Sequence, residues 1–241
     1  MVVLSETQED HAKKSFTADK QAKTLRRLKE RYGMPINDSE RPRVAVSIHA
    51  CKAYIATLLN GPDKADDVLR QFRIAAMAGD LVDEPNVIHA VASKAGIDST
   101  ELDTWLRQEA VEKRLLEDMQ AARAPALPAR AMEHKLSVLS EGGYRYSTPS
   151  YQFYKDTKLK FEVPGFWPQP FYDVAIANIT PELKRKKDPN NVKEVLEWAG
   201  EPLATAEIAA VTGKAIEEVR LSLKKFATFA PMGQDGFWSL H

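Results

Sequence analysis

The chain carries a single cysteine, Cys51, whose thiol is the group best suited by type to nucleophilic or redox chemistry. Thiol–disulfide exchange needs an attacking thiolate and a second thiol that resolves the mixed disulfide. One cysteine excludes an intramolecular disulfide and a multi-cysteine metal site within the 241 residues. His49 is two positions away, so on a helix its side chain would lie on a different face from that of Cys51. We therefore interpret Cys51 as a buried thiol that takes no part in catalysis.

The remaining histidines and the paired carboxylates show no metal-binding pattern. The other histidines are scattered along the chain, at His11, His89, His134 and His241. The acidic pairs Asp66-Asp67 and Asp83-Glu84 lie at the expected starts of helices, where the helix dipole favours negative charge. We expect neither a metal site nor a bound cofactor.

Pro149 lies in an aromatic and β-branched stretch in which a strand is expected. Because proline has no N–H to donate to the ladder of a sheet, it belongs at a sheet edge or at the first residue of a strand. Only about 5–6% of X–Pro bonds in folded proteins are cis. From the residues alone, an ordinary trans proline at the start of a strand is the simplest interpretation.

The C-terminal residues raise the question of DNA binding. Residues 188–241 contain eight acidic and five basic side chains. A helix that reads DNA presents its first exposed residues to phosphates and base edges, and the candidate here begins at Lys214 and continues with Glu217 and Glu218, which would repel phosphate. The basic run 184–187 could contact a phosphate backbone, but we prefer to interpret it as a solvated linker. Nucleic acid is therefore not an expected partner.

The overall composition excludes further classes of function. The 34 basic and 34 acidic side chains balance, which argues against a protein wrapped in nucleic acid or laid on an anionic membrane. The N-terminus lacks the pattern of a secretory signal, and no stretch approaches the ~18 apolar residues that cross a bilayer. We expect a cytoplasmic protein without a membrane partner.

Helical patterns follow one another through the first half of the chain. Apolar residues recur at spacings of three or four over residues 17–32, and Gly33 is a stop signal. Similar patterns predict further helices as far as Ala122, with a stop at Gly79 and a start at Pro85. These apolar stripes are typical of the core of a helical domain.

The pattern then changes to that of strands. Residues 144–154 are rich in aromatic and β-branched side chains, residues 159–163 alternate, and the turn-type stretch 155–158 separates them, which together predict a β-hairpin. Pro168 and Pro170 mark the start of a further helix.

Residues 190–241 form a pattern of their own. They predict a helix around residues 192–199, a short helix capped by Thr205, a third helix over residues 216–226, and a turn before a terminal strand at 237–240. This order of elements is typical of a winged helix.

Three stretches of the chain resemble, in order, the thioredoxin-fold oxidoreductases of the DsbA type, in which a helical domain is inserted into a thioredoxin fold. Residues 78–88 and 95–98 are similar to a helix–turn–helix of that insertion. Residues 147–151, Ser-Thr-Pro-Ser-Tyr, look like the loop in which a cis-proline precedes a strand, and residues 164–168, Pro-Gly-Phe-Trp-Pro, look like the lead into the last helix. The resemblance spans roughly residues 25–180.

The resemblance implies that the Thr148–Pro149 bond is cis and that this loop leaves a backbone edge for a substrate peptide. It also implies a first strand followed by Cys-x-x-Cys at a helix N-terminus, where the dipole lowers the pKa of the first thiol. The sequence has no such motif, and residues 1–5 resemble the second strand of the family. The chain is either an N-terminally shortened relative or a non-catalytic scaffold, and the sequence leaves both open.

We therefore predict an α/β protein. Residues 1–187 would form a thioredoxin-like sheet, shortened at its N-terminus, with a helical domain inserted at about 37–140, and residues 188–241 a small winged-helix-like domain. By resemblance the protein is a DsbA-family thiol–disulfide oxidoreductase without its own Cys-x-x-Cys, so that this chain alone is inactive. The alternatives are a non-catalytic thioredoxin-fold binding or scaffold protein and a winged-helix DNA-binding regulator.

The predicted site is a substrate-binding loop, formed by Thr148 and Pro149, for a thiol or peptide substrate. The sequence identifies no catalytic residue, and it determines neither the substrate, nor the redox partner, nor the oligomeric state.

Overall fold

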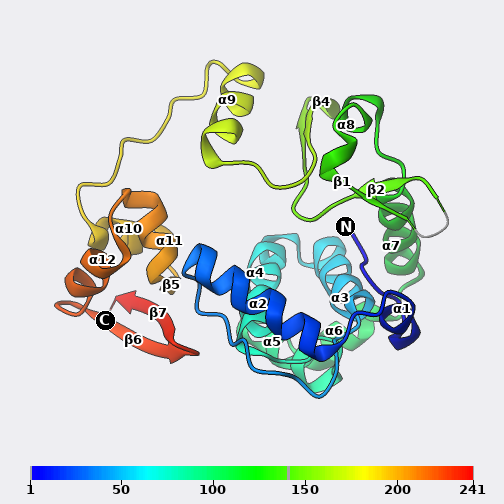
Figure 1. The fold of residues 1–241 in the computed structure, drawn as a ribbon, viewed down its shortest axis with the longest axis horizontal. Coiled ribbons are helices and arrows are strands. Elements are labelled where there is room, and N and C mark those ends of the chain that lie inside the picture. Colours follow the sequence, from blue (N-terminus) through cyan, green and yellow to red (C-terminus); the bar gives the residue numbers. More distant parts are fainter. Residues whose placement is uncertain (1, 140–141, 241) are drawn as a thin grey trace. The chain divides into compact units, whose positions relative to one another are not determined.

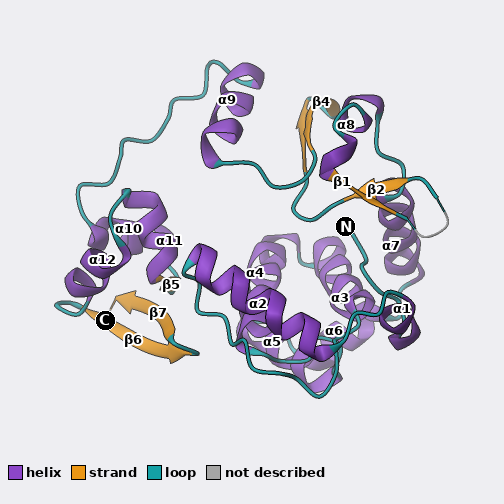
Figure 2. Ribbon diagram, in the orientation of Figure 1, coloured by secondary structure: helices purple, strands orange, loops and turns teal. Residues whose placement is uncertain are grey.

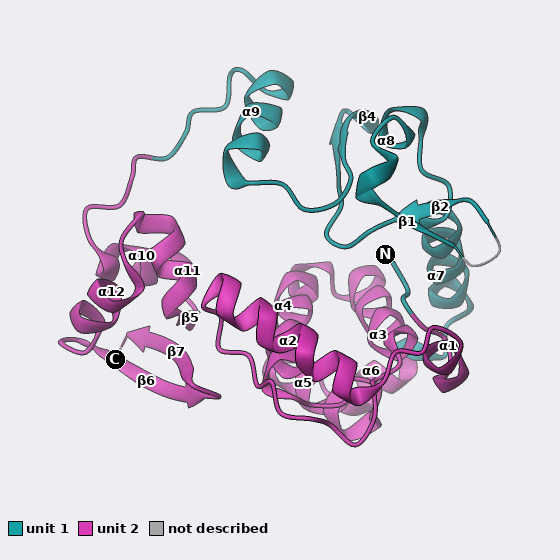
Figure 3. Ribbon diagram, in the orientation of Figure 1, with its two compact units in different colours: residues 1–4, 105–186 teal, residues 5–104, 187–241 magenta. Residues whose placement is uncertain are grey.

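The computed structural model describes residues 2–139 and 142–240. They form a mixed α/β protein with a helix-rich N-terminal half and small antiparallel sheets (Figures 1 and 2). The chain divides into two compact units: unit 1 comprises residues 1–4 and 105–186, and unit 2 comprises residues 5–104 and 187–241 (Figure 3).

The helices expected in the first half of the chain are present. The helices that lie in unit 2 or run to its edge, whether expected or not, are α1 (Gln8–Lys13), α2 (Ala18–Tyr32), α3 (Ser47–Asn60), α4 (Ala65–Ala78), α5 (Pro85–Lys94) and α6 (Ser99–Leu106). The prediction for residues 17–32 is confirmed, because the Thr17 hydroxyl accepts a hydrogen bond from the Lys20 N–H at 3.3 Å and so caps α2. Helix α1 was not predicted, and its six residues bury no side chain.

Two features of the structure favour a glycine at position 33, where α2 ends. The Gly33 φ of +67° lies in the left-handed region that glycine adopts without steric cost. A Cβ at this position would also lie 2.6 Å from Cδ1 of Ile216, so a larger residue would have to displace that side chain.

Unit 1 contains α7, a set of short strands, and α9. Its elements are α7 (Glu109–Ala122), α8 (Leu127–Arg130), β1 (Leu136–Val138), β2 (Tyr144–Tyr146), β3 (Tyr151–Lys155), β4 (Lys158–Val163) and α9 (Gln169–Ile179). The predicted hairpin is confirmed as β3 and β4, which pair antiparallel with Phe153 opposite Phe161. Its two-residue turn, Asp156-Thr157, has φ values of +51° and +62°, as a type I′ turn requires.

The expectation of one long strand over residues 144–154 is wrong. The structure contains β2, a bend over residues 147–150, and then β3. Because Pro149 has no N–H, it cannot continue a ladder, and β2 pairs instead with β1, which was not predicted. Among the described residues, β1–β2 and β3–β4 are two separate two-stranded sheets, not the single sheet that was expected.

The strand expected over residues 1–5 is also absent from residues 2–5, while Met1 lies outside the described residues. The reason is visible at Ser5, whose backbone N–H donates to the Ser47 hydroxyl at 3.0 Å and whose carbonyl accepts from the Ile48 N–H at 3.2 Å. The backbone groups of Ser5 therefore bind the start of α3 and do not join a sheet.

The C-terminal segment (residues 188–241) shows the predicted order of elements with two strands added. It contains α10 (Val192–Ala199), β5 (Leu203–Ala204), α11 (Thr205–Thr212), α12 (Ile216–Leu223), β6 (Ala227–Met232) and β7 (Asp235–Leu240). The strands form one sheet in the order β5-β7-β6. The hydrophobic core of the C-terminal segment includes Val195, Leu196, Ile208, Val219, Leu223 and Trp238. His241 lies outside the described residues.

The C-terminal segment and the helices of unit 2 share an ion cluster around Arg70 of α4. The Arg70 guanidinium lies 2.9 Å from the carboxylate of Glu207 and 2.7 Å from that of Glu201. It also donates to the carbonyl of Pro202 at 2.7 Å. One side chain of α4 thus binds both the loop before β5 and the first turn of α11.

No helix in the part of the chain that the structure describes is both long and apolar enough to span a bilayer.

Candidate functional site

The loop between β2 and β3 carries the two residues that the sequence singled out. The Thr148–Pro149 bond is cis, as predicted. Both side chains are exposed, and β3 starts two residues later, at Tyr151. Pro149 therefore precedes the strand that pairs with β4 and does not open it.

Two serines hold this loop in place. The Ser147 hydroxyl donates to the Lys135 carbonyl, and the Ser150 hydroxyl donates to the Ser147 carbonyl. The Ser150 oxygen also accepts a hydrogen bond from the Gly165 N–H at 3.0 Å. This hydrogen bond brings together the stretches 147–151 and 164–168. The sequence shows their order along the chain but does not show that they are in contact.

Gly165 is required at this junction. Its φ is +71°, and a Cβ there would lie 3.0 Å from the Lys135 carbonyl oxygen, the same atom that accepts from Ser147. A larger residue would combine an unfavourable backbone conformation with a backbone clash.

Aromatic contacts stiffen the segment that follows. The Trp167 ring stacks on Phe171 with 4.4 Å between ring centroids, and its indole N–H donates to the Pro164 carbonyl at 2.9 Å. The Lys135 ammonium lies 4.3 Å from the centre of the Trp167 ring and donates to the Phe166 carbonyl at 3.1 Å. Lys135 thus ties the loop and the start of α9 to one another.

A buried carboxyl group, Glu162 of β4, lies among the side chains that precede and follow the loop. It accepts hydrogen bonds from the Tyr146 hydroxyl and from the Gln152 amide, the latter at 2.7 Å. The Tyr146 oxygen in turn accepts from the Ala126 N–H at 3.2 Å. Burial, and then the hydrogen bond to Glu162, raise the pKa of Tyr146 above its ordinary value.

The sequence analysis missed Glu162. It falls in a strand that also carries the exposed Lys158 and Lys160, so its charge does not distinguish it in the local pattern. Its burial, at 3% exposure, results from partners 16 and 10 residues away in the chain.

A cavity of about 430 Å³ begins beside the loop at Ser150 and extends along Gln152 and Tyr154 to α7. Arg114 and Asp118 of α7 form an ion pair at 2.9 Å on its wall. A concave surface with apolar, hydroxyl and charged groups therefore adjoins the exposed Thr148 and Pro149.

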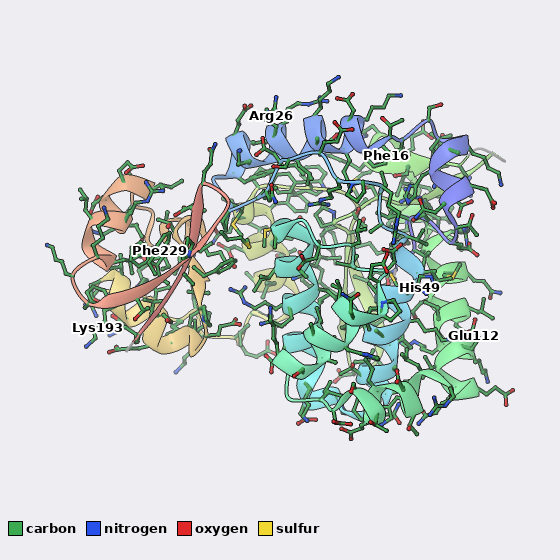
Figure 4. All side chains as sticks on the ribbon, turned by 90° about the horizontal axis from the view of Figure 1, so that it is seen from below. Phe16, Arg26, His49, Glu112, Lys193 and Phe229 are labelled. Atoms are coloured by element: carbon green, nitrogen blue, oxygen red, sulfur yellow. The ribbon has the colours of Figure 1, made fainter. Side chains whose placement is uncertain are left out.

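Cys51 lies on α3, in the other unit, and its side chain is buried, as interpreted from the sequence. His49 is exposed on the same helix (Figure 4). The two residues therefore do not share a surface on which they could act as a pair. In the part of the chain that is described, no group of three or more His, Cys, Asp or Glu residues could hold a metal ion.

The first turn of α12 is acidic, as expected from the sequence. Glu217 and Glu218 are exposed, and they form ion pairs with Arg220 and Lys214 on the same segment. The basic run 184–187 is exposed as well.

Comparison with known proteins supports the resemblance over the first half of the chain. Residues 10–127 match the family model of the DSBA-like thioredoxin domain. No curated protein matches the chain. Residues 10–127 are therefore similar to a DSBA-like thioredoxin domain, and the single cysteine of the chain argues against a Cys-x-x-Cys active site.

Proposed function

We propose that this protein, which has a DSBA-like region but only one cysteine, binds an extended polypeptide at the Thr148–Pro149 loop and does not catalyse dithiol oxidation. The observation that carries the proposal is the loop itself. Thr148 and Pro149 are exposed while Ser147 and Ser150 fix the backbone on both sides. A preorganised loop loses little conformational entropy when a ligand binds.

The backbone beside the loop offers hydrogen-bonding groups to such a ligand. β3 pairs with β4 along one edge, and no other strand among the described residues pairs with β3. An extended peptide can add to an unpaired sheet edge through main-chain hydrogen bonds. The adjoining cavity at Ser150, Gln152 and Tyr154 would then receive a side chain of that peptide.

The absence of turnover follows from thiol chemistry. Dithiol oxidation needs a thiolate nucleophile and a second, resolving thiol. The chain has one cysteine, and its side chain is buried on α3. A redox-active partner would therefore have to supply the missing thiols.

On this proposal, β1–β4 and α9 belong to a thioredoxin-like fold. The helices inserted at about 37–140 would form the helical domain, and residues 188–241 a winged-helix-like packing module. These boundaries stay predictions. The element order α10, β5, α11, α12, β6 and β7, with the three strands in one sheet, supports the assignment of the last module.

A fluorescein-labelled, carboxymethylated insulin B chain is a suitable probe, because it is extended and carries no reactive thiol. We expect its fluorescence anisotropy to rise saturably with the protein. Thr148→Arg should weaken binding by about tenfold, since a large side chain would cover the loop. Thr24→Arg is the matched control, because Thr24 is an exposed threonine of α2. Equal binding by both variants, or no binding by the wild type, would disprove the peptide site.

The second half of the proposal is tested by activity. In an insulin-reduction assay with dithiothreitol, wild type and Cys51→Ala should both match the rate without protein. Alkylation of Cys51 by iodoacetamide should be slow near pH 6, because its side chain is buried. Turnover that disappears in Cys51→Ala, or rapid alkylation at this pH, would identify Cys51 as a redox nucleophile.

A further inference from the structure

A second cavity, of about 610 Å³, lies between the β3–β4 hairpin and α9 in unit 1. Its apolar wall is formed by Phe161 of the hairpin and by Phe171, Val174, Ala175 and Ile179 of α9. Its volume falls within the range of about 300–1,000 Å³ that is typical of small-molecule sites. The peptide loop proposed above is not among its lining residues, so this is a separate feature of the hairpin.

The apolar wall is only partly covered by the protein itself. Val174 is 61% exposed and Phe161 is 40% exposed. Phe161 and Phe171 lie 6.3 Å apart between ring centroids, so the two aromatic rings contact each other and form a continuous apolar surface from the hairpin to the helix. Removing this surface from water would favour the binding of an apolar group.

The rim of the cavity is basic. Lys155 and Lys160 line it, and Lys158 lies opposite Lys155 in the hairpin register. The Lys155 ammonium is paired with the Glu182 carboxylate at 2.9 Å. Lys160 forms no hydrogen bond or ion pair with any described residue, and Asp156 is the one carboxylate among the lining residues.

We propose that this cavity binds a fatty carboxylate with a single alkyl chain. The alkyl chain would lie against Phe161, Phe171 and Val174, and the carboxylate would pair with the Lys160 ammonium. The combination of an apolar wall with an uncompensated cation at its mouth is complementary to this class of ligand. A peptide would fit less well, because its backbone amides need hydrogen-bonding partners that the wall lacks.

Tryptophan fluorescence offers a readout, because the ring of Trp167, one of the four tryptophans of the chain, stacks on the cavity residue Phe171. We would titrate the full-length protein with 11-bromoundecanoate, whose bromine quenches tryptophan, below the concentration at which it forms micelles. Saturable quenching is expected, and competition by dodecanoate should reverse it. The absence of saturable quenching would overturn the proposal.

Charge variants test the site. Lys160→Glu and Val174→Glu should each weaken dodecanoate binding at least about tenfold, because each places a carboxylate next to that of the ligand. Lys113→Glu and Leu116→Glu make the same exchanges at exposed positions of α7 and should leave binding unchanged. Circular dichroism identifies any variant that fails to fold. If Val174→Glu does not fold, Lys160→Glu still tests the site, because the Lys160 side chain is exposed and has no partner among the described residues.

Two further ligands separate the proposal from its alternatives. 1-Dodecanol has the alkyl chain without the charge and should bind more weakly by about tenfold. Vesicles of phosphatidylglycerol should retain no more protein than vesicles of phosphatidylcholine. Equal binding of the alcohol would refute recognition of the carboxylate, and protein that binds anionic vesicles but not dodecanoate would assign the surface to a membrane instead.

Discussion

At the residue scale, the loop depends on side chains that sequence reasoning did not select. Pro149 was singled out because proline interrupts a ladder, and Thr148 because of the family resemblance. Ser147, Ser150 and Gly165 hold the backbone that presents them, through hydrogen bonds between segments up to 15 residues apart. Glu162, Tyr146 and Gln152 add a buried polar network to the same part of unit 1.

The network predicts a large effect of a small change at Tyr146. Tyr146→Phe removes a donor from buried Glu162 and an acceptor from the Ala126 N–H. We expect a loss of about 1–3 kcal/mol in the free energy of unfolding, measured by urea titration.

Tyr154→Phe is the control for this measurement. The Tyr154 hydroxyl donates to the Gln152 amide oxygen at 3.0 Å but its side chain is exposed, so the change should be within about 0.5 kcal/mol. A similar loss in the free energy of unfolding in the two variants would show that the buried network contributes no more to stability than an exposed hydrogen bond.

Asp38 predicts a pH effect. Hydrogen bonds from Lys29 and then Arg26 of α2 lower the pKa of Asp38 from 3.8 to about 2. A carboxyl whose pKa is lower in the folded state adds stability above its unfolded pKa, and this stability is lost as the pH falls through the folded pKa. The contribution of Asp38 should therefore be complete above pH ~4 and disappear towards pH ~2.

The comparison of wild type with Asp38→Asn checks this prediction. The difference in melting temperature between the two proteins should shrink as the pH is lowered from about 5 towards about 2, because the protonated Asp38 carboxyl and the amide of the variant both lack the negative charge. A difference that stays constant across this range would contradict the assigned pKa.

At the scale of elements, local patterns account for the helices and the turns. The capping of α2 by Thr17, the start of α5 at Pro85 and the β3–β4 hairpin all follow from residues that are near in sequence. Two elements were predicted wrongly. The strand β1 was missed although its partner β2 is only 6–10 residues away, and residues 2–5 form no strand because the backbone of Ser5 binds a distant segment. Ser5 pairs with Ser47, 42 residues away.

Arg70 provides a test of how the C-terminal segment is held. Arg70→Ala removes the ion pairs to Glu201 and Glu207 and the hydrogen bond to Pro202. Since hydrogen bonds to charged groups contribute about 1.5–3 kcal/mol each, we expect faster amide hydrogen exchange in β5 and α11.

Arg73→Ala serves as the control, because Arg73 is an exposed arginine of the same helix. Its exchange rates in β5 and α11 should equal those of the wild type. Unchanged exchange in Arg70→Ala would show that other contacts hold the segment.

At the scale of the whole molecule, the charges of the C-terminal segment argue against a role as a DNA reader. Residues 188–241 carry eight acidic and five basic side chains, and α12 opens with the exposed Glu217 and Glu218. Ile216, at the start of α12, also packs near Gly33 of the same unit. The end of α12 that would face DNA is thus acidic, and one of its side chains, Ile216, packs against the protein itself.

We therefore expect duplex DNA to bind no more tightly than the non-specific range of about 10⁻⁴–10⁻⁶ M at physiological salt. A gel-shift titration with random and genomic duplexes measures this. Specific binding in the nanomolar range would make the protein a regulator and reverse the assignment of this segment.

The sequence by itself determined the helices other than α1 and α8, the β3–β4 hairpin, the order of the C-terminal elements, and the lack of a second thiol. Each of these depends on residue type or on spacing within one element, where periodicity and capping act over a few residues. Only the tertiary structure decided that Ser150 meets Gly165, that Glu162 is buried, that β2 pairs with β1, and that a basic rim surrounds an apolar cavity at α9. These features depend on contacts between different segments of the chain, which the periodicity and capping of a single element do not specify.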